Sequence, residues 1–359
     1  MIRDEEVLRA YRENDDEFFM RLAIRLAEFG RGFVSPNPLV GAVIVNKGRI
    51  VGIGYHRRYG EEHAEVRAIR EAGESCKGAR MYVSLEPHNF YGKQPPCTKA
   101  IIEAGIKEVI IGSLDPNPKV RGKGVKELLN AGIDVKWGVL EDEVRKQNEA
   151  FFTFYEKNRP FVALKMALTV DGKIADIGGK SKWITDDFSR MLVHKLRGEY
   201  DAIVVGANTV LTDNPLLTPR DVYSERMPFR VVVSGRGNVP FSARIFHTEN
   251  APTILITSGE PVVPEGVIVR KIKNIDAQKI LEVLKDFGIQ SVLVEGGRMM
   301  FSTFLNSGLV DKIYAFVSPS FMGKGLDVYA ENLGLERRLK FKIDEVLKLE
   351  NDVLIVMRR

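Results

Sequence analysis

Near the start of the chain, apolar residues recur every three or four positions, as they do on the buried face of an amphipathic helix. We expect this helix to run from Asp15 to Gly30, with Asn14 or Asp15 as its N-cap and Gly30 at its end. The apolar face consists of Phe19, Leu22, Ala23 and Leu26. The pattern therefore predicts a helix with one face packed on a core.

After this helix, short apolar runs alternate with segments of helical spacing. The runs 41–45 and 50–53 flank Asn46-Lys47-Gly48, which predicts a hairpin. Further strands are expected at 79–85, 108–112 and 134–137, and helices from near 63, at 97–104 and at 125–130. This alternation predicts an α/β sandwich with a mixed sheet.

A change of character marks the boundary between two domains. Residues 141–158 form an expected charged helix with an aromatic cluster, and Pro160 follows its end. We expect a first domain over residues 1–150, a linker over 151–160 and a second, strand-rich domain over 161–359. The expected strands of the second domain include 161–168, 202–205, 230–233, 253–257, 291–294, 312–317 and 353–357.

Composition fits two globular domains: the chain has 359 residues, 28% charged and 44% apolar. The net charge of +5 is spread along the chain without a basic block, so we expect no nucleic-acid partner. No apolar run reaches the roughly 18 residues that cross a bilayer, and the charged first residues are unlike a signal peptide. Cys76 and Cys97 are too few for a disulfide scaffold. We therefore expect a cytoplasmic protein without a membrane partner.

The strongest chemical signal is a set of residues with the spacing of a zinc deaminase site. His63 and Glu65 form a His-x-Glu pair, and His88 and Cys97 each follow a proline further along the chain. A His-x-Glu pair alone is common in helices, so the argument depends on the order and spacing of the full set. We expect His63, His88 and Cys97 to bind Zn²⁺ and leave a fourth position for water, while Glu65 moves protons.

Segments around these residues are more particular than the zinc ligands themselves. They are Asn37-Pro38, Val40-Gly41, 52–56, Tyr59-Gly60, Leu85-Glu86-Pro87, Pro95-Pro96 and 115–122. With them the sequence resembles the deaminase half of the bifunctional riboflavin-biosynthesis family, a diaminohydroxyphosphoribosylaminopyrimidine deaminase joined to a 5-amino-6-(5-phosphoribosylamino)uracil reductase. The resemblance implies a cytidine-deaminase-like, three-layer α/β/α domain. It also implies attack at the carbon that bears the 2-amino group of the pyrimidinone. The substrate contacts that it implies are Asn37, His56, Asp115 and Asn117, although residues 115–118 could equally be a plain turn.

The zinc motif departs from the family pattern at one ligand. The family has cysteine where this chain has His88, whereas the interval from His88 to Cys97 matches. Two histidines and one cysteine are acceptable zinc ligands. A neutral imidazole in place of a thiolate raises the net charge of the site by one unit. Phe90 and Lys93 replace a family histidine and arginine, which puts some substrate contacts in doubt.

The second domain carries a longer series of short motifs. They are 165–173, Ser181, Trp183, Thr185, Arg197, Asp201-Ala202, Gly206, Thr209, 213–215, 217–220 and 294–297. Each is weak alone, but in this order they resemble the reductase half of the same family, which has a dihydrofolate-reductase-like α/β fold. The resemblance implies that NADPH reduces the ribosyl group of the deaminated substrate to a ribityl side chain.

The resemblance assigns residues of this domain to three roles. The implied NADPH-binding residues are Ala167, Trp183, Thr209, Asp213, Gly297, Arg298, Met299, Met300, Phe301, Ser302 and Thr303. The implied substrate-binding residues are Ser181, Arg197, Leu217, Arg220 and Glu295. Two arginines suit a phosphate because the guanidinium fork binds it bidentately, although Arg197 could instead be a solvated charge at a helix end. Lys165 and Asp171 are candidates for proton handling or, alternatively, structural ion-pair partners.

The residues themselves support a phosphate site in this domain. Gly296 and Gly297 follow an expected strand and precede an expected helix over 298–305, so backbone amides can approach a diphosphate. The segment is not the G-x-G-x-x-G fingerprint, which disfavours a Rossmann domain. His194 and His247 have no motif around them, and we interpret both as ordinary.

We therefore expect a two-domain enzyme for consecutive steps of riboflavin synthesis, acting on small phosphoribosylated pyrimidines and assembled as a homo-oligomer, dimer or tetramer. One alternative is a nucleobase or tRNA deaminase with an unrelated tail, against which the reductase motifs argue. The other is a reductase whose degenerate deaminase domain serves as a binding or assembly module, which only His88 favours. Zinc content separates these hypotheses.

Overall fold

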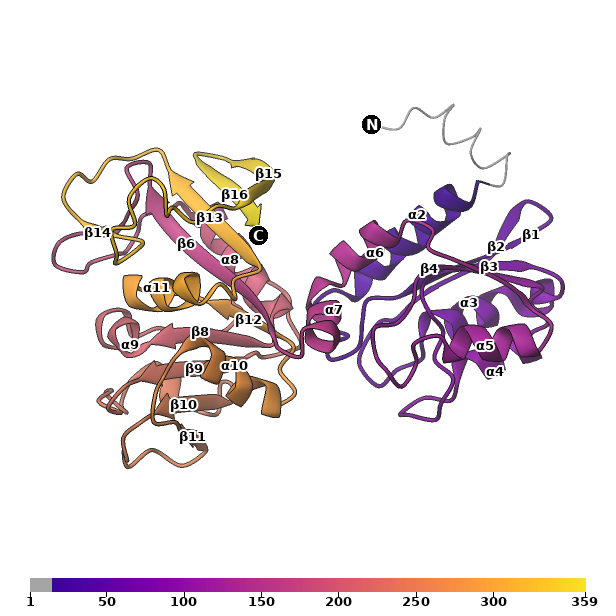
Figure 1. Cartoon of the computed structure of the whole chain (residues 1–359), viewed down its shortest axis with the longest axis horizontal. Helices are drawn as coiled ribbons and strands as arrows, with labels where there is room; N and C mark the ends of the chain where they lie inside the picture. The colour runs from indigo at the N-terminus through magenta and orange to yellow at the C-terminus, as the bar shows by residue number, and fades with distance from the viewer. Residues whose placement is uncertain (1–14) are drawn as a thin grey trace. The chain divides into compact units, whose positions relative to one another are not determined.

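The computed structural model describes residues 15–359. The contacts within the chain divide it into two compact units, and the division falls between Asn158 and Arg159 (Figure 1). The expectations for residues 1–14, including Asn14 as a cap, lie outside the described residues. Among residues 15–359, no helix is long and apolar enough to span a membrane.

The first unit is built on a five-stranded sheet in the order β2-β1-β3-β4-β5. β1 is antiparallel to β2 and β3, whereas β4 is parallel to β3 and β5. The predicted hairpin and mixed sheet are therefore confirmed. The strands are β1 (Gly41–Asn46), β2 (Arg49–Tyr55), β3 (Arg80–Leu85), β4 (Glu108–Ser113) and β5 (Asp134–Trp137).

Helices cover both faces of this sheet, as Figure 1 shows. The first predicted helix is confirmed as α2 (Asp16–Ala27) and a 3-10 turn, η1 (Glu28–Gly30), with the Asp15 carboxylate accepting a hydrogen bond from the Glu17 amide. On one face, α2, α6 and α7 share a core with Phe19 and Tyr82. On the other face, α3, α4 and α5 share a core with Ile44 and Met81. The remaining helices are α3 (Ala64–Ala72), η2 (Gly73–Cys76), α4 (Cys97–Glu103), α5 (Lys123–Asn130), α6 (Glu141–Gln147) and α7 (Glu149–Glu156).

The single helix expected over residues 141–158 is instead two helices, α6 and α7, that meet at Asn148. The Asn148 side chain is buried, accepts a hydrogen bond from the Leu39 amide at 2.7 Å and donates one to the Leu39 carbonyl at 3.0 Å. These bonds tie the helix junction to the segment before β1. Phe151 and Phe152 of α7 belong to the core of the first unit.

The second unit is built on a nine-stranded sheet in the order β11-β10-β9-β8-β12-β6-β13-β16-β15. Its strands from β11 to β13 run parallel, and β16 and β15 continue the sheet in antiparallel pairs. The strands are β6 (Phe161–Thr169), β8 (Ala202–Gly206), β9 (Phe229–Ser234), β10 (Thr253–Thr257), β11 (Val267–Lys271), β12 (Ser291–Val294), β13 (Lys312–Ser318), β15 (Lys342–Leu349) and β16 (Asp352–Arg358). A small sheet pairs β7 (Lys173–Ala175) with β14 (Leu326–Asp327).

The central strands of this sheet position the second site. β12 lies between β8 and β6 and is parallel to both, so the carboxyl ends of all three meet at one edge of the sheet. Ligands of open parallel sheets bind at this edge. The helices are α8 (Asp187–Glu199), α9 (Ala207–Asp213), η3 (Arg244–Phe246), α10 (Ala277–Asp286) and α11 (Arg298–Ser307).

Candidate active sites

The three predicted zinc ligands lie at element ends. His63 is the N-cap residue of α3, Cys97 is the first residue of α4, and His88 follows the carboxyl end of β3. The ligand atoms of the three side chains lie within 4.8 Å of one another. Sγ of Cys97 is 3.4 Å from Nδ1 of His63, and the His63 and His88 ring centroids are 4.6 Å apart.

The burial and chemistry of these residues fit a divalent cation. Burial, with His88 and His56 nearby, lowers the pKa of His63 to about 3, so the ring is neutral with a lone pair to share. Nδ1 of His88 is buried without a hydrogen-bond partner among residues 15–359. Burial raises the pKa of the Cys97 thiol, but a coordinating thiol is deprotonated by the metal. Imidazole and thiolate are the ligands that zinc prefers.

Glu65 lies beside the ligands in the first turn of α3 and is only 3% exposed. Its Oε2 is buried and has no hydrogen-bond partner within the described part of the chain. Burial raises the pKa of Glu65, while a hydrogen bond with Cys97 acts in the opposite direction. A carboxyl group whose pKa is moved toward neutrality is suited to general acid–base work.

His56 and Asn37 form a fixed pair next to the ligands. Nδ1 of His56 lies 3.2 Å from the Glu62 carbonyl oxygen and therefore donates, so Nε2 accepts from Nδ2 of Asn37 at 3.1 Å. The His56 ring centroid lies 4.9 Å from that of His63. The structure thus brings two of the four implied substrate contacts to the zinc ligands.

The other two implied contacts lie on the loop after β4, and it is indeed a turn. The Asp115 carboxylate accepts a hydrogen bond from the Asn117 amide at 2.7 Å, and the Asn117 side chain accepts one from the Lys119 amide at 3.0 Å. Asp115 is nevertheless buried. Burial, with the negative charge of Glu86 nearby, raises the pKa of Asp115 to about 7.

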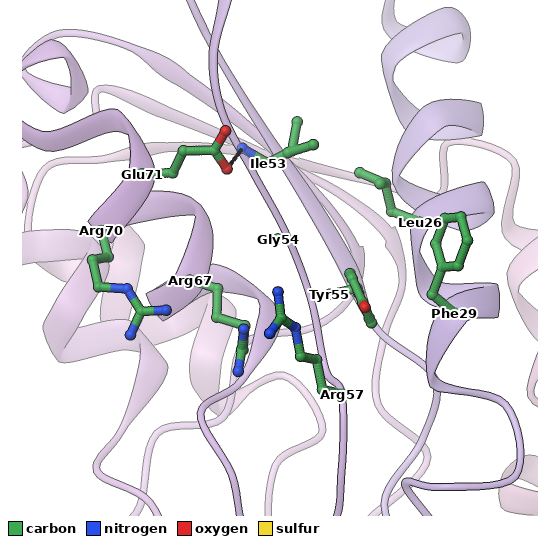
Figure 2. A pocket seen from close by; sticks show the side chains of 9 residues that line it. All are labelled: Leu26, Phe29, Ile53, Gly54, Tyr55, Arg57, Arg67, Arg70 and Glu71. Atoms are coloured by element: carbon green, nitrogen blue, oxygen red, sulfur yellow. Dashed lines mark hydrogen bonds between the residues drawn. The ribbon is translucent and has the colours of Figure 1, made fainter.

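A hollow of about 520 Å³ lies beside residues 53–55 of β2, and none of the predicted zinc ligands lines it (Figure 2). One of its charged side chains holds α3 to this edge strand, and two others pair with the loop before α3. Oε2 of Glu71 accepts a hydrogen bond from the Ile53 amide at 3.0 Å, which caps one backbone group of the strand edge. The ion pairs are Arg67 with Glu61 and Arg70 with Glu62. We assign this hollow no catalytic role.

In the second unit, a network of buried charges surrounds Glu295, which follows the carboxyl end of β12. Arg197 of α8 holds the Glu295 carboxylate bidentately at 2.6 and 2.9 Å, and Nζ of Lys165 lies 3.8 Å from it. Despite its burial, these cations lower the pKa of Glu295 to about 2. Burial and Arg197 lower the pKa of Lys165, while Glu295 opposes them. An ammonium group in this state is suited to donating a proton.

His194, interpreted from the sequence as ordinary, lies between two of the implied substrate-binding residues. Its Nδ1 is 3.3 Å from Nη1 of Arg197 and its Nε2 is 3.5 Å from Nη2 of Arg220. Burial, with these two guanidinium groups, lowers the pKa of His194 to about 4, so the ring is neutral. Because the fork of Arg197 is occupied by Glu295, Arg220 is the better placed of the two arginines for a phosphate.

The implied diphosphate site is the start of α11. Gly297 is its N-cap residue, and among the described residues no side chain caps it. The Gly297 amide donates to Oγ1 of Thr209 in α9 at 3.3 Å, which brings two implied NADPH-binding residues together. Met300 and Phe301 point into the core, so only their backbone can face a ligand. The hydroxyls of Ser302 and Thr303 bond to helix carbonyls, those of Arg298 and Met299.

The other residues that the resemblance implies for the second domain differ in their burial and contacts. Oγ of Ser181 donates to Asp213 at 3.2 Å, and Trp183 is exposed under the Arg190 guanidinium. Ala167 is half-buried on β6, and Leu217 is buried with its backbone in the left-handed conformation. The Asp171 carboxylate accepts hydrogen bonds that lower its pKa to about 2. Its donors are the Thr169 hydroxyl and the amides of Met322 and Gly323. These contacts favour the structural alternative for Asp171 over proton transfer.

A His/His/Cys cluster beside a glutamate, in a three-layer α/β/α unit, defines a cytidine-deaminase-like zinc domain. Consistently, residues 13–113 match the cytidine and deoxycytidylate deaminase zinc-binding region, and residues 160–355 match the RibD C-terminal domain. The riboflavin biosynthesis protein RibD of Aquifex aeolicus is 46% identical over 352 residues, 96% of this chain and 98% of that protein. The RibD of Escherichia coli is 35% identical, over 95% of this chain and 98% of that protein.

Solved structures agree over the whole length. RibD of Acinetobacter baumannii has a TM-score of 0.90 at 35% identity, covering 96% of this chain and 99% of that one. The Thermotoga maritima diaminohydroxyphosphoribosylaminopyrimidine deaminase/5-amino-6-(5-phosphoribosylamino)uracil reductase has a TM-score of 0.87 at 45% identity, covering 97% and 99%. The chain belongs to the RibD family of bifunctional deaminase/reductases of riboflavin biosynthesis.

Membership decides between the sequence hypotheses. The predicted pairing of a cytidine-deaminase-like domain with a dihydrofolate-reductase-like domain is confirmed. A deaminase with an unrelated tail is wrong, because the second unit is the reductase domain of the same family. The His63, His88 and Cys97 cluster supports an active deaminase rather than a degenerate one.

We predict that His88→Ala weakens zinc binding by more than about 100-fold, because loss of a residue that only hydrogen-bonds to a metal ligand already costs about 10- to 100-fold. His88→Cys, which restores the family's thiolate, should retain the metal. Zinc per chain after competition with a chelator measures both effects. Unchanged zinc retention in His88→Ala would show that His88 is not a ligand.

Proposed function

We propose that the first unit deaminates 2,5-diamino-6-(5-phosphoribosylamino)pyrimidin-4-one, and that the second unit reduces the ribosyl group of the product with NADPH. The observation that carries the proposal is the cluster of three zinc ligands with Glu65 beside it, in a chain that also holds the reductase domain. The name of the Thermotoga maritima relative supports this substrate class. A cytoplasmic setting is part of the proposal, since Cys97 can ligate a metal only while it stays reduced.

In the deaminase step, water adds to the ring carbon that bears the 2-amino group, the carbon–nitrogen bond breaks and ammonia leaves. Zinc, when bound to His63, His88 and Cys97, polarises the attacking water. Glu65 accepts one proton from this water and delivers it to the ring nitrogen, and then transfers the remaining hydroxyl proton of the added water to the leaving amine. Asn37, which is hydrogen-bonded to His56, orients the pyrimidinone ring of the substrate. Asp115 accepts a hydrogen bond from the same ring.

In the reductase step, NADPH supplies a hydride to the anomeric carbon of the ribosyl group. The bond from this carbon to the ring oxygen breaks, and the oxygen takes a proton. Lys165 is the proton donor that the contacts support, because its ammonium is buried beside Glu295. Arg220 binds the phosphate, with His194 against its guanidinium. The uncapped start of α11 and Thr209 bind the diphosphate of the cofactor.

Cys97→Ala tests whether the two sites are separate. We expect it to abolish ammonia release and to leave NADPH oxidation on the deaminated intermediate at the wild-type rate, because Lys165 and Glu295 belong to the other unit. The matched control is Cys76→Ala, since Cys76 is also buried but its thiol donates to the Ile69 carbonyl and is not part of the candidate metal cluster. Loss of both activities in a folded Cys97→Ala variant would contradict independent sites.

Asp115 makes the deaminase step pH-dependent. Its pKa is raised to about 7, and protonation turns one of its two acceptor oxygens into a donor and weakens its hydrogen bonds from donors on the ring. The kcat/KM for deamination should therefore fall about tenfold per pH unit below pH 7. Asp115→Asn should lower kcat/KM and remove this limb from the profile. A limb that persists in Asp115→Asn would assign it to another group.

The proposal includes a homo-oligomer, and β15 is the surface that supports it. β15 is an edge strand of the nine-stranded sheet, and its apolar Ile343 and Val346 are 66% and 56% exposed. An exposed apolar edge strand pairs readily with another strand, and a second copy supplies one with the same pattern. We infer that two copies associate through β15.

We expect the double substitution Ile343→Lys and Val346→Lys to lower the mass of the particle measured by light scattering. Added charge on both apolar positions opposes edge pairing without touching the core. Lys348→Glu, on the same strand and also exposed, is the control for a change of charge alone. A wild-type monomer, or an unchanged mass in the double variant, would contradict this interface.

A further inference from the structure

Glu86 lies between the two halves of the proposed deaminase site. It follows the last residue of β3 and precedes His88 by two positions, and its amide donates to the Ser113 carbonyl at 3.0 Å. Its side chain is 4% exposed, yet it is neither a zinc ligand nor one of the implied substrate contacts. A carboxylate so deeply buried needs partners that offset its desolvation.

Those partners are three backbone amides of the β4–α5 loop, residues 114–122, and of the helix that follows. Oε2 of Glu86 accepts from the Asp115 amide at 3.2 Å and from the Gly122 amide at 3.0 Å. Oε1 accepts from the Val125 amide at 3.2 Å. One carboxylate therefore holds the loop at both ends and caps the first turn of α5, where a negative charge is also favourable.

Packing reinforces these hydrogen bonds. A Cβ atom added at Gly124 would lie 2.1 Å from the Pro87 carbonyl oxygen and 3.2 Å from Oε1 of Glu86. The start of α5 therefore rests directly on the Glu86-Pro87 backbone, immediately before the ligand His88. The loop and the zinc ligand are attached to the same short segment of chain.

We propose that Glu86 is a positioning residue of the deaminase site, which sets the place of Asp115 and Asn117 relative to the zinc ligand His88. Glu86 touches neither the metal nor the substrate, and acts through the loop. The inference rests on the proposed deaminase function, because it assigns Asp115 and Asn117 to the pyrimidine. Substrate position matters at this scale, since a displacement of about 1 Å can cost about 100-fold in rate.

Glu86→Gln is the test, because glutamine keeps the size of the side chain but replaces one acceptor oxygen with an NH2 group. That NH2 group would face backbone amides that now donate to Glu86. We expect kcat/KM for ammonia release to fall roughly 10- to 100-fold, mostly through KM, since the loop contacts the substrate before and during the reaction. Zinc should stay at one per chain, and NADPH oxidation on the deaminated intermediate should be unchanged. The control is Glu74→Gln, an exposed glutamate whose ion-pair partner within residues 15–359 is Lys77.

A double-mutant cycle separates positioning from a general structural role. If Glu86 acts through Asp115, Glu86→Gln should add little to the loss caused by Asp115→Ala, and the two effects should not be additive. Hydrogen exchange should show lost protection over residues 114–125 and unchanged protection over α3. Full additivity, or wild-type kinetics in Glu86→Gln, would overturn the proposal.

Loss of zinc together with loss of protection over α3 would also overturn it, because Glu86 would then hold the whole unit rather than the loop. Failure of the underlying function looks different: the unsubstituted chain, loaded with zinc, would release no ammonia at all.

Discussion

The zinc site depends on the direct contact of α3 with the edge strand β2. Cβ atoms added at Gly52 and Gly54 would lie 2.3 and 2.2 Å from the carbonyl oxygens of Ala68 and Ala64, so no side chain separates the helix from the strand. This contact fixes the distance between the first turn of α3 and the sheet. It thereby fixes the positions of His63 and Glu65. Cys97, at the start of α4, and His88, after the end of β3, complete the site next to α3.

The reductase site is organised by a buried charge rather than by a close backbone contact. Glu295 is held at the carboxyl end of β12 by Arg197 from α8 and by Lys165 from the neighbouring strand β6. Removal of one partner from such a network leaves an uncompensated buried charge. The network therefore fixes Lys165, the proposed proton donor, beside Glu295 and leaves Arg220, with the neutral His194, at its exposed side.

The sequence predicted what periodicity and ordered motifs encode: the strands of the first unit, the mixed sheet, the helix after Gly297 and the set of three residues that the fold brings together as a candidate zinc site. It missed features that depend on distant contacts. The break at Asn148 arises from hydrogen bonds to Leu39, and β15 has too little apolar periodicity to be recognised alone. Arg197 is one helical turn from His194 in α8, but Arg220 becomes its neighbour only through the fold. Glu86 was visible only as part of a motif, since its three amide donors are far away in sequence.

The most direct test of this account is ammonia release from 2,5-diamino-6-(5-phosphoribosylamino)pyrimidin-4-one, with zinc quantified on the same sample. The account predicts one zinc per chain and steady release of ammonia, because His88 takes the place of the family's cysteine beside His63 and Cys97. No zinc and no ammonia, with NADPH oxidation on the deaminated intermediate intact, would contradict it and leave a reductase that carries an inactive deaminase domain.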